Sequence, residues 1–182
     1  MPFKLFRKRH RHDDAANALY VALVGQARQT VFYAELGVAD SLEGRYDMIV
    51  LHAFLVFRRL GRVGSEAAKE LSQQTFDFMF TDLDQNLREM GVTDMGIGKR
   101  VKRMAEAFYG RAGAYDSALE NDGPDLADAL RRNLYQQVAV GEAVLARMSA
   151  YVRAQAAHLD GQDEAALLAG RVSFLPPAPE VG

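Results

Sequence analysis

The residue types that carry most metal and covalent chemistry are scarce in this chain. It has no cysteine and only four histidines among its 182 residues. The lack of cysteine excludes disulfides, thiolate chemistry and cysteine-based zinc or iron–sulfur sites. Glu-x-x-His, which ferritin-like di-metal sites need on two helices, does not occur, and neither does the His-Glu-x-x-His of zinc proteases. We therefore expect no bound cofactor and no enzymatic activity.

Two local features still invite a chemical interpretation. His52 lies in a mostly apolar segment, where we expect a core histidine bonded to a neighbour; the alternative is a ligand or catalytic base acting with nearby acids. Metal analysis of the purified protein would test that alternative. The segment 95–100, MGIGKR, has two glycines before Lys99 and resembles a phosphate-binding loop. It lacks the preceding strand and the spacing, so we do not assign it that role.

The most unusual feature is the basic run KRVKR at 99–103. Its cations are Lys99, Arg100, Lys102 and Arg103. They open a predicted helix, where the helix dipole favours anions instead. In one interpretation, which we slightly favour, the acidic end of the preceding helix (Asp82, Asp84, Glu89) neutralises them. In the other, they await an anionic partner such as RNA, lipid headgroups or an acidic protein.

Composition limits the partners further. Nearly half of the residues are apolar and a quarter are charged, which is ordinary for a globular domain. The formal net charge of −2 argues against whole-domain nucleic-acid binding, and we expect no specific DNA binding. The basic leader 1–13 is not followed by an apolar region, so it is no secretory signal. We interpret it as a solvated tail; the alternative has Phe3, Leu5 and Phe6 entering an anionic membrane surface.

The stretch that must position these residues is a helix predicted over about 41–60. It is apolar on nearly every side, which is typical of a helix buried among others. Asp40 is the expected N-cap, with Glu43 completing the capping box, and Gly61 the expected end. Only ten residues, Met48 to Phe57, separate its charges, against about 20 needed to cross a bilayer.

Helical periodicity predicts further helices over about 14–28, 66–90, 94–120, 124–138 and 141–159, followed by a short turn ending at Gly170. Expected caps are Ser65 and Gly91 around the second of these, and Asp94 at the start of the third. No period-2 alternation is long enough to need a strand. We predict an all-α single domain of about six main helices over 14–170, with an extended C-terminal tail, 171–182, whose end, LPPAPEVG, has no core residues.

Gly110 and Gly113 lie in the middle of a predicted helix, where each costs about 1 kcal/mol relative to alanine. Close approach of another helix would explain them. That helix could be the protein's own or a bound segment. We predict that Gly110→Leu keeps the fold but loses binding in the second case, and unfolds the protein in the first.

Several sequence blocks occur in the order found in one known family. They are Asp40 with Glu43-Gly44-Arg45, Leu51-His52, Asp84 with Leu87-Arg88-Glu89, Gly91 with Asp94, Gly98-Lys99-Arg100-Val101, and Phe108-Tyr109-Gly110-Arg111 with Tyr115. Over about residues 17–155 the chain resembles the ubiquinol–cytochrome c chaperones, which are assembly factors for the cytochrome bc complex of the respiratory chain. Mitochondrial members carry a targeting extension, whereas this chain begins almost at the domain, so it looks like a bacterial-type member.

The resemblance implies a non-enzymatic chaperone that binds newly made cytochrome b, alone or with other assembly factors. Ribosome contact and a small partner protein, known for mitochondrial members, are not assumed here. We expect a cytoplasmic protein, peripheral on the inner membrane if it touches it at all. The partner-binding candidates are Arg45, Asp47, His52, Arg88, Glu89, Asp94, Lys99, Arg100, Lys102, Arg103, Gly110, Arg111 and Tyr115. Contact through the basic run 99–103 with RNA, the ribosome or a membrane surface is the alternative function.

Overall fold

The computed structural model describes the backbone of residues 3–89, 91, 94–120 and 125–177, and the side chains in these ranges except 3–13, 94–95, 97 and 125. Within them lie the helices α1 (Phe3–Ala27), α2 (Thr30–Ala34), α3 (Leu42–Val63), α4 (Glu66–Glu89), α5 (Asp94–Glu120), α6 (Asp125–Asn133), α7 (Glu142–Asp160) and α8 (Glu164–Leu168). The described residues contain no strand, which confirms the all-α prediction.

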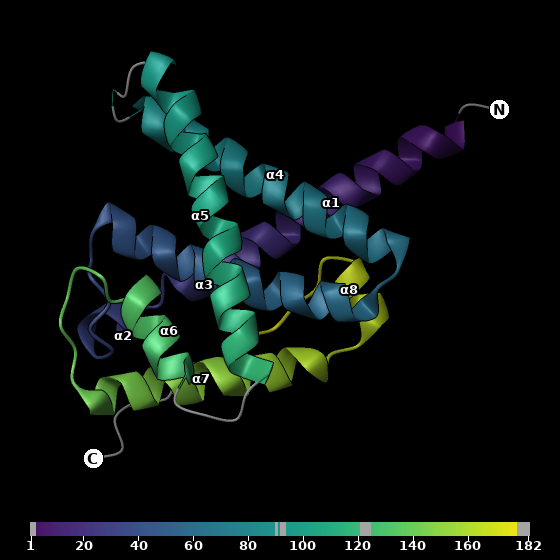
Figure 1. The fold of residues 1–182 in the computed structure, drawn as a ribbon. Coiled ribbons are helices and arrows are strands. Elements are labelled where there is room, and N and C mark those ends of the chain that lie inside the picture. The colour runs from purple at the N-terminus through teal and green to yellow at the C-terminus, as the bar shows by residue number, and fades with distance from the viewer. Residues whose placement is uncertain (1–2, 90, 92–93, 121–124, 178–182) are drawn as a thin grey trace.

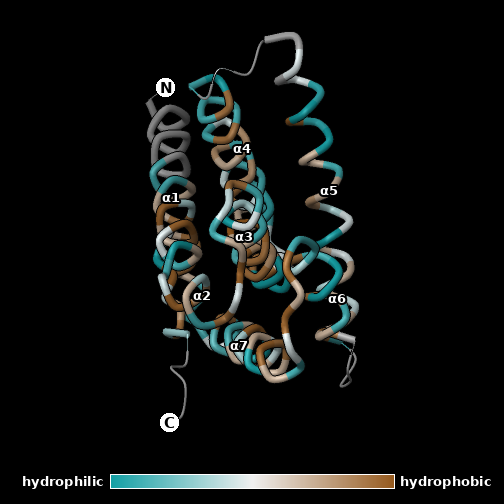
Figure 2. The backbone as a smooth tube through the Cα atoms, turned by 90° about the vertical axis from the view of Figure 1, so that its left-hand side faces the viewer, coloured by the Kyte–Doolittle hydropathy of each residue, from teal (hydrophilic) through white to brown (hydrophobic). Residues whose placement is uncertain are grey.

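The helices form one body in which α3 packs against α1, α4, α5 and α7. Figure 1 shows α4 and α5 joined at one tip, with α5 descending toward α7. Figure 2, turned by a right angle, shows α1, α4 and α5 upright and α7 lying across their lower end. The α3 side chains that face these neighbours are buried, and they recur at helical spacing between Tyr46 and Leu60.

Both ends of α3 differ from the sequence prediction. Ser41, not Asp40, is the N-cap: its hydroxyl accepts a hydrogen bond from the Gly44 amide at 3.1 Å. Asp40 forms an ion pair with Arg45 at 2.7 Å instead. Gly61 does not end the helix, which runs on to Val63 and is capped by Gly64 at φ +71°. Packing of Leu60 and Val63 in the core continues the helix past Gly61.

Other predicted boundaries hold in part. Ser65 Oγ accepts from the Ala68 amide at 3.3 Å at the start of α4, and Gly91 follows α4 with φ +80°, as predicted. The first helix begins at Phe3 and not near residue 14, because no helix-breaking residue separates the leader from the rest. The fifth predicted helix is shorter: α6 ends at Asn133, and α7 begins at Glu142. The side chain of Asp94, the expected cap of α5, lies outside the described side chains.

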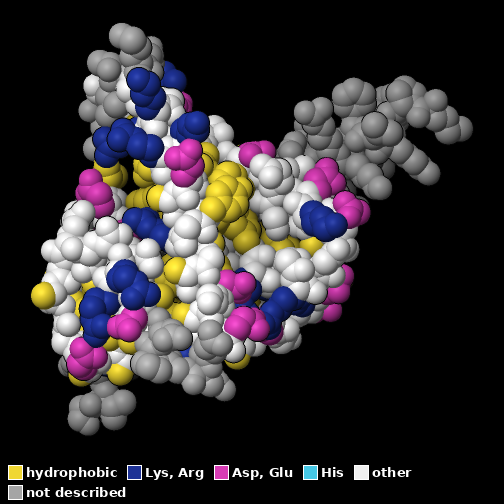
Figure 3. Space-filling view, viewed as in Figure 1, with side chains coloured by type: hydrophobic (Ala, Val, Ile, Leu, Met, Phe, Trp, Pro, Cys, Tyr) yellow, Lys and Arg dark blue, Asp and Glu magenta, His cyan; other side chains and the backbone are white. Residues whose placement is uncertain are grey.

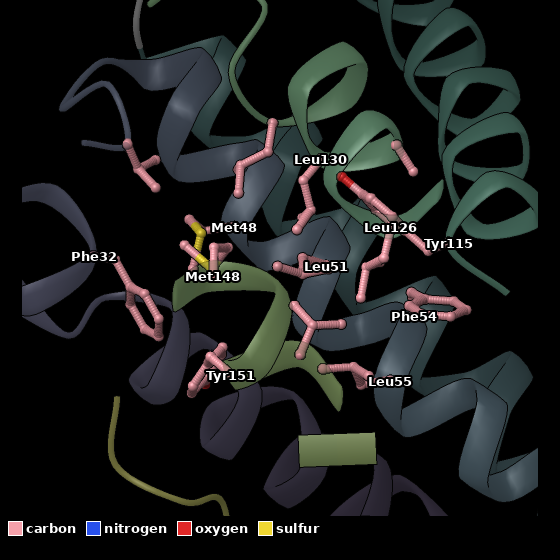
Figure 4. Close-up of a cluster of buried hydrophobic side chains, with 14 of the residues drawn as sticks. Phe32, Met48, Leu51, Phe54, Leu55, Tyr115, Leu126, Leu130, Met148 and Tyr151 are labelled. Atoms are coloured by element: carbon pink, nitrogen blue, oxygen red, sulfur yellow. The ribbon is translucent and has the colours of Figure 1, made fainter. Parts of the chain in front are cut away.

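The core surrounds α3. Figure 4 shows Met48, Leu51 and Leu55 of α3 with Phe32, Met148 and Tyr151 on one side and Leu126, Leu130 and Tyr115 on the other. Two further clusters are formed where α3 meets α1, α4 and α5. The half-buried ring of Phe174 contacts all three clusters.

The C-terminal tail contacts the core through Val172 and Phe174, which precede its LPPAPEVG end. Residues 171–177, which we call the C-terminal strap, are extended but pack along α1 and α7. Gln155 of α7 exchanges two hydrogen bonds with the Leu175 backbone, at 2.6 and 3.1 Å, and Gln26 of α1 donates to the same carbonyl at 2.9 Å. Gly170, at φ +78°, permits the entry: a Cβ there would lie 2.6 Å from the Ala15 carbonyl oxygen. Paired glutamine amides, not apolar periodicity, hold the strap.

Candidate functional site

An open groove of about 760 Å³ lies between α3, α4 and α5. We call it the aromatic groove. Five aromatic residues line it: Phe54 and Phe57 of α3, Phe76 of α4, and Phe108 and Tyr109 of α5. The Phe76 ring centroid lies 5.4 Å from that of Phe108 and 5.6 Å from that of Tyr109, which it stacks on. Figure 3 shows these hydrophobic side chains open to solvent between α4 and α5. Tyr109 is 62% exposed, the largest fraction of any described large hydrophobic residue.

The walls of the groove carry small residues where helices face it. Gly61 of α3 and Gly113 of α5 both line it, and no described atom lies within 4 Å of a Cβ built on either. The same holds for Gly110, which is exposed but does not line the groove. The protein's own helices therefore do not explain these two mid-helix glycines of α5. For Gly113, which lines the groove, close approach of a bound segment is the remaining explanation and stays a prediction.

One end of the groove is closed by a network of charges. Arg58, with a side chain only 10% exposed, pairs with Asp116 and Glu120 of α5 at 3.0 Å each and with Asp160 of α7 at 3.4 Å. Arg62 pairs with Glu120 at 3.2 Å and with Asp160. These bridges tie the C-terminal end of α3 to α5 and α7, so the aromatic floor is held between anchored helices.

On the other side of α5, an ion pair joins it to α3. Arg111 contacts Asp47 at 2.5 Å, and both side chains are mostly buried. Burial raises the pKa of Asp47 to about 6, while the Arg111 guanidinium acts in the opposite direction. Tyr115, one turn further along α5, is fully buried with its ring centroid 5.6 Å from that of Phe54. Asp47, Arg111 and Tyr115 thus position α5 against α3.

His52 is a core histidine bonded to neighbours, as predicted. It has no exposed surface, and its Nδ1–H donates to the Met48 carbonyl at 2.8 Å. Its Nε2 then accepts from the Tyr151 hydroxyl at 2.8 Å, and that hydroxyl oxygen accepts from Gln26 at 2.9 Å. Burial lowers the pKa of His52 to about 4, with the Met48 hydrogen bond opposing it. The imidazole is therefore neutral at pH 7, and it has no exposed surface that a partner protein could contact.

The remaining candidates lie on the surface near the α4–α5 tip. Arg45 is exposed and pairs with Asp40; Arg88 pairs with Asp84 at 2.7 Å as predicted; Glu89 accepts from Gln85 at 3.1 Å. Lys102 lies 3.9 Å from Glu106 of its own helix. Among the described residues, no carboxylate pairs with Lys99, Arg100 or Arg103.

The interpretation in which the end of α4 neutralises the basic run is therefore wrong for the described part of the chain. The acids of α4 are engaged elsewhere. Asp82 accepts from the Tyr20 hydroxyl at 2.7 Å and from Asn86 at 3.0 Å, and Asp84 pairs along α4 with Arg88. Asp84 and Glu89 bind partners four residues away on α4, which the helix already positions, while Asp82 binds Tyr20 of α1.

The groove itself was not foreseen. Helical spacing puts Phe57 on an apolar face of the central helix. Phe76 and Tyr109 are not among the partner-binding candidates that the sequence suggests. A helical wheel assigns apolar residues to a face but does not say whether another helix covers that face. Tyr109 did lie in a block that carried the family resemblance, which was the only available signal.

The described residues include neither a membrane-spanning helix nor a cluster of metal-binding side chains. None of their helices is long and apolar enough to cross a lipid bilayer. No group of three or more His, Asp or Glu side chains among them is arranged to hold a metal ion.

Comparison with known proteins supports an assignment to one family. The profile of the ubiquinol-cytochrome C chaperone family matches residues 34–174. The ubiquinol-cytochrome-c reductase complex assembly factor 1 of Xenopus laevis is 28% identical over 89% of this chain and 81% of its own length. The protein of the same name from Homo sapiens is also 28% identical, and the chain spans about half of it, 54%.

A solved structure agrees. The crystal structure of the Cbp3 homolog from Brucella abortus superposes with a TM-score of 0.83 and is 37% identical, over 96% of this chain and 97% of that one. Mitochondrial CBP3 of Saccharomyces cerevisiae is 25% identical over 82% of this chain and 46% of its own length. The chain therefore belongs to the ubiquinol-cytochrome C chaperone family.

Proposed function

We propose that the protein is a non-enzymatic assembly chaperone for ubiquinol–cytochrome c reductase, and that it holds newly made cytochrome b in the aromatic groove. The names of its relatives as assembly factors support the first part. The observation that carries the second is an open groove lined by five aromatic rings and by two glycines, Gly61 and Gly113, whose Cβ positions no other described segment approaches.

The physical reason lies in what such a client exposes. A membrane subunit that has left the ribosome presents apolar helix faces that water does not solvate well. Aromatic rings bury large areas per residue and suit a partner surface. Gly61 and Gly113 permit a client helix to approach the backbones of α3 and α5 closely, where dispersion contacts are strongest. No covalent or metal chemistry is required for this role.

Photo-crosslinking tests the position of the client. A photoreactive residue at Tyr109 should crosslink to cytochrome b in cells. The same residue at Val21, exposed to 60% but on α1 and outside the groove, serves as the control. Equal crosslinking from both positions, or crosslinking from Val21 alone, would place the client elsewhere.

Matched glycine variants test the fit. Gly113 lines the groove and Gly110 does not, although both have open space at Cβ. Gly113→Leu should keep its helical content and thermal stability but lose capture of cytochrome b and lower the yield of the bc complex. Gly110→Leu, the variant suggested by the sequence, becomes the control with the same helix and the same added side chain. Loss of capture only in Gly110→Leu would contradict the groove.

A second candidate function is contact with RNA or the ribosome through the basic run. The observation that favours it is that Lys99, Arg100 and Arg103 pair with no described carboxylate. Affinity for RNA would then fall steeply with salt, by a log–log slope of roughly −0.7 per phosphate contacted. A flat salt dependence would exclude it.

A further inference from the structure

A second pocket, of about 480 Å³, lies on the other side of α5 from the aromatic groove. It is lined by the start of α3, the end of α4, the stretch of α5 from Arg100 to Arg111 and the segment 134–138. Its volume falls in the range of ligand pockets, about 300–1,000 Å³. Nothing in the proposed client role uses it.

Guanidinium groups line this pocket along α5. Arg100, Arg103 and Arg111 face it at helical spacing. Arg111 is engaged with Asp47, but Arg100 and Arg103 have no described carboxylate partner. Asp47 and the exposed Glu43 are the carboxylates of the lining. Since Asp47 is already paired, the pocket retains two unpaired guanidinium groups against one carboxylate at its rim.

Much of the remaining lining is apolar. Leu83 of α4, Met104 of α5, Leu42 and Val138 contribute apolar side chains, beside the amides of Gln136 and Gln137. Leu42 and Val138 are 39% and 37% exposed, so this apolar surface is open to solvent. Figure 3 shows hydrophobic side chains near the α4–α5 tip bordered above and below by Lys and Arg side chains. A ligand that satisfies the whole pocket needs an anionic group joined to an apolar body.

We propose that this pocket binds one anionic phospholipid, with its phosphate at Arg100 and Arg103 and part of an acyl chain against Leu83 and Met104. Guanidinium groups bind phosphate oxygens through paired, charge-assisted hydrogen bonds. Free phosphate would leave the apolar walls in water, and RNA would find no exposed ring to stack on among the lining residues. The site is separate from the client groove and stands whether or not cytochrome b is the client.

The test is lipid binding by the purified full-length chain. Dihexanoyl phosphatidylglycerol, kept below its micelle concentration, is titrated into the protein by calorimetry beside dihexanoyl phosphatidylcholine and inorganic phosphate. Phosphatidylglycerol should bind tightest, and Arg100→Gln with Arg103→Gln should weaken it by at least about tenfold, the loss of one charge-assisted contact. Lys102→Gln is the control, because Lys102 has the same charge on the same helix but does not line the pocket. It should change binding less than about twofold.

A second variant fills the pocket without changing its charge. Ala107 is exposed and lines it, so Ala107→Trp should fold normally and abolish phosphatidylglycerol binding. Three results would overturn the proposal: inorganic phosphate binding as tightly as the lipid, Lys102→Gln acting as strongly as the arginine variants, or Ala107→Trp binding normally. Binding of an acidic peptide that lacks an acyl chain, in place of the lipid, would identify the pocket as a protein contact instead.

Discussion

His52 is neutral in the folded protein because burial lowers its pKa to about 4, from 6.5 in an unfolded chain. Its contribution to stability is therefore complete above pH 6.5 and is lost as the pH falls from 6.5 toward 4. This shift is worth about 3 kcal/mol. The raised pKa of Asp47 acts with the opposite sign over the same pH range, so the effect of His52 is measured by chemical denaturation at pH 7 and pH 4.5 against a variant that cannot take up the proton.

The variant His52→Gln isolates this effect. Gln keeps a donor and an acceptor for Met48 and Tyr151 but cannot take up the proton. The variant should be less stable than the wild type at pH 7, and the gap should narrow as the pH falls. Taking the difference between the two proteins removes the contribution of Asp47, whose raised pKa acts with the opposite sign. If the gap does not change with pH, then His52 takes up its proton as readily in the folded protein as in the unfolded chain, and folding does not shift its pKa.

Phe54 and Phe57 lie one turn apart on α3 and differ in how much of each side chain is buried. Phe54 is buried to 4% exposure, so Phe54→Ala should cost about 3–5 kcal/mol of unfolding free energy. Phe57 is half-buried and lines the aromatic groove, so Phe57→Ala should cost about 1–2 kcal/mol. Thermal unfolding measures both, and Phe57→Ala should lose more client capture than its stability explains. Equal destabilisation would show that Phe57 belongs wholly to the core.

At the scale of elements, the start of α3 gives a direct test of the corrected cap. Ser41→Ala removes the hydrogen bond to the Gly44 amide and should destabilise by about 1 kcal/mol. Asp40→Ala removes only an exposed ion pair and should lower stability less than Ser41→Ala does. The reverse order in denaturant midpoints would restore Asp40 as the cap.

Helix α5 offers a prediction of opposite sign. Gly110 and Gly113 have negative φ and free space at Cβ. Replacing either by Ala should therefore stabilise the protein by about 0.5–1 kcal/mol, because the unfolded chain loses freedom. Denaturation of each single variant measures this gain. Destabilisation would reveal a contact at these positions within the protein itself.

The sequence predicts the elements that depend on local interactions, and it does not predict those that depend on contacts between distant residues. Helical periodicity and local caps such as Ser65 and Gly91 were readable because they depend on neighbours in the chain. The sequence does not show whether Asp40 or Ser41 is the N-cap of α3, since both residue types are good caps. In the structure Asp40 pairs with Arg45, and Ser41 caps the helix. The aromatic groove and the strap depend on which helix faces stay uncovered and on hydrogen bonds from Gln26 and Gln155 over long sequence separations.

At the scale of the whole molecule, Phe174 joins three core clusters from an extended segment. Phe174→Ala should lower stability by about 2 kcal/mol, since the ring is half-buried. Because all three clusters lose the same contact, unfolding should remain a single transition when followed by circular dichroism and by tyrosine fluorescence. Two separated transitions would show that the strap stabilises only one part of the protein.

The strap also has a consequence for how the protein is made. α1 leaves the ribosome first and the strap last, yet Gln26 and Leu175 share a hydrogen bond across 149 positions of the chain. Contacts at such separation raise the contact order and slow folding, since the intervening chain must be ordered before they form. A nascent chain that stops short of Phe174 leaves its three clusters without their common ring. The molecule thus completes its own core only after the strap has been made and has left the ribosome.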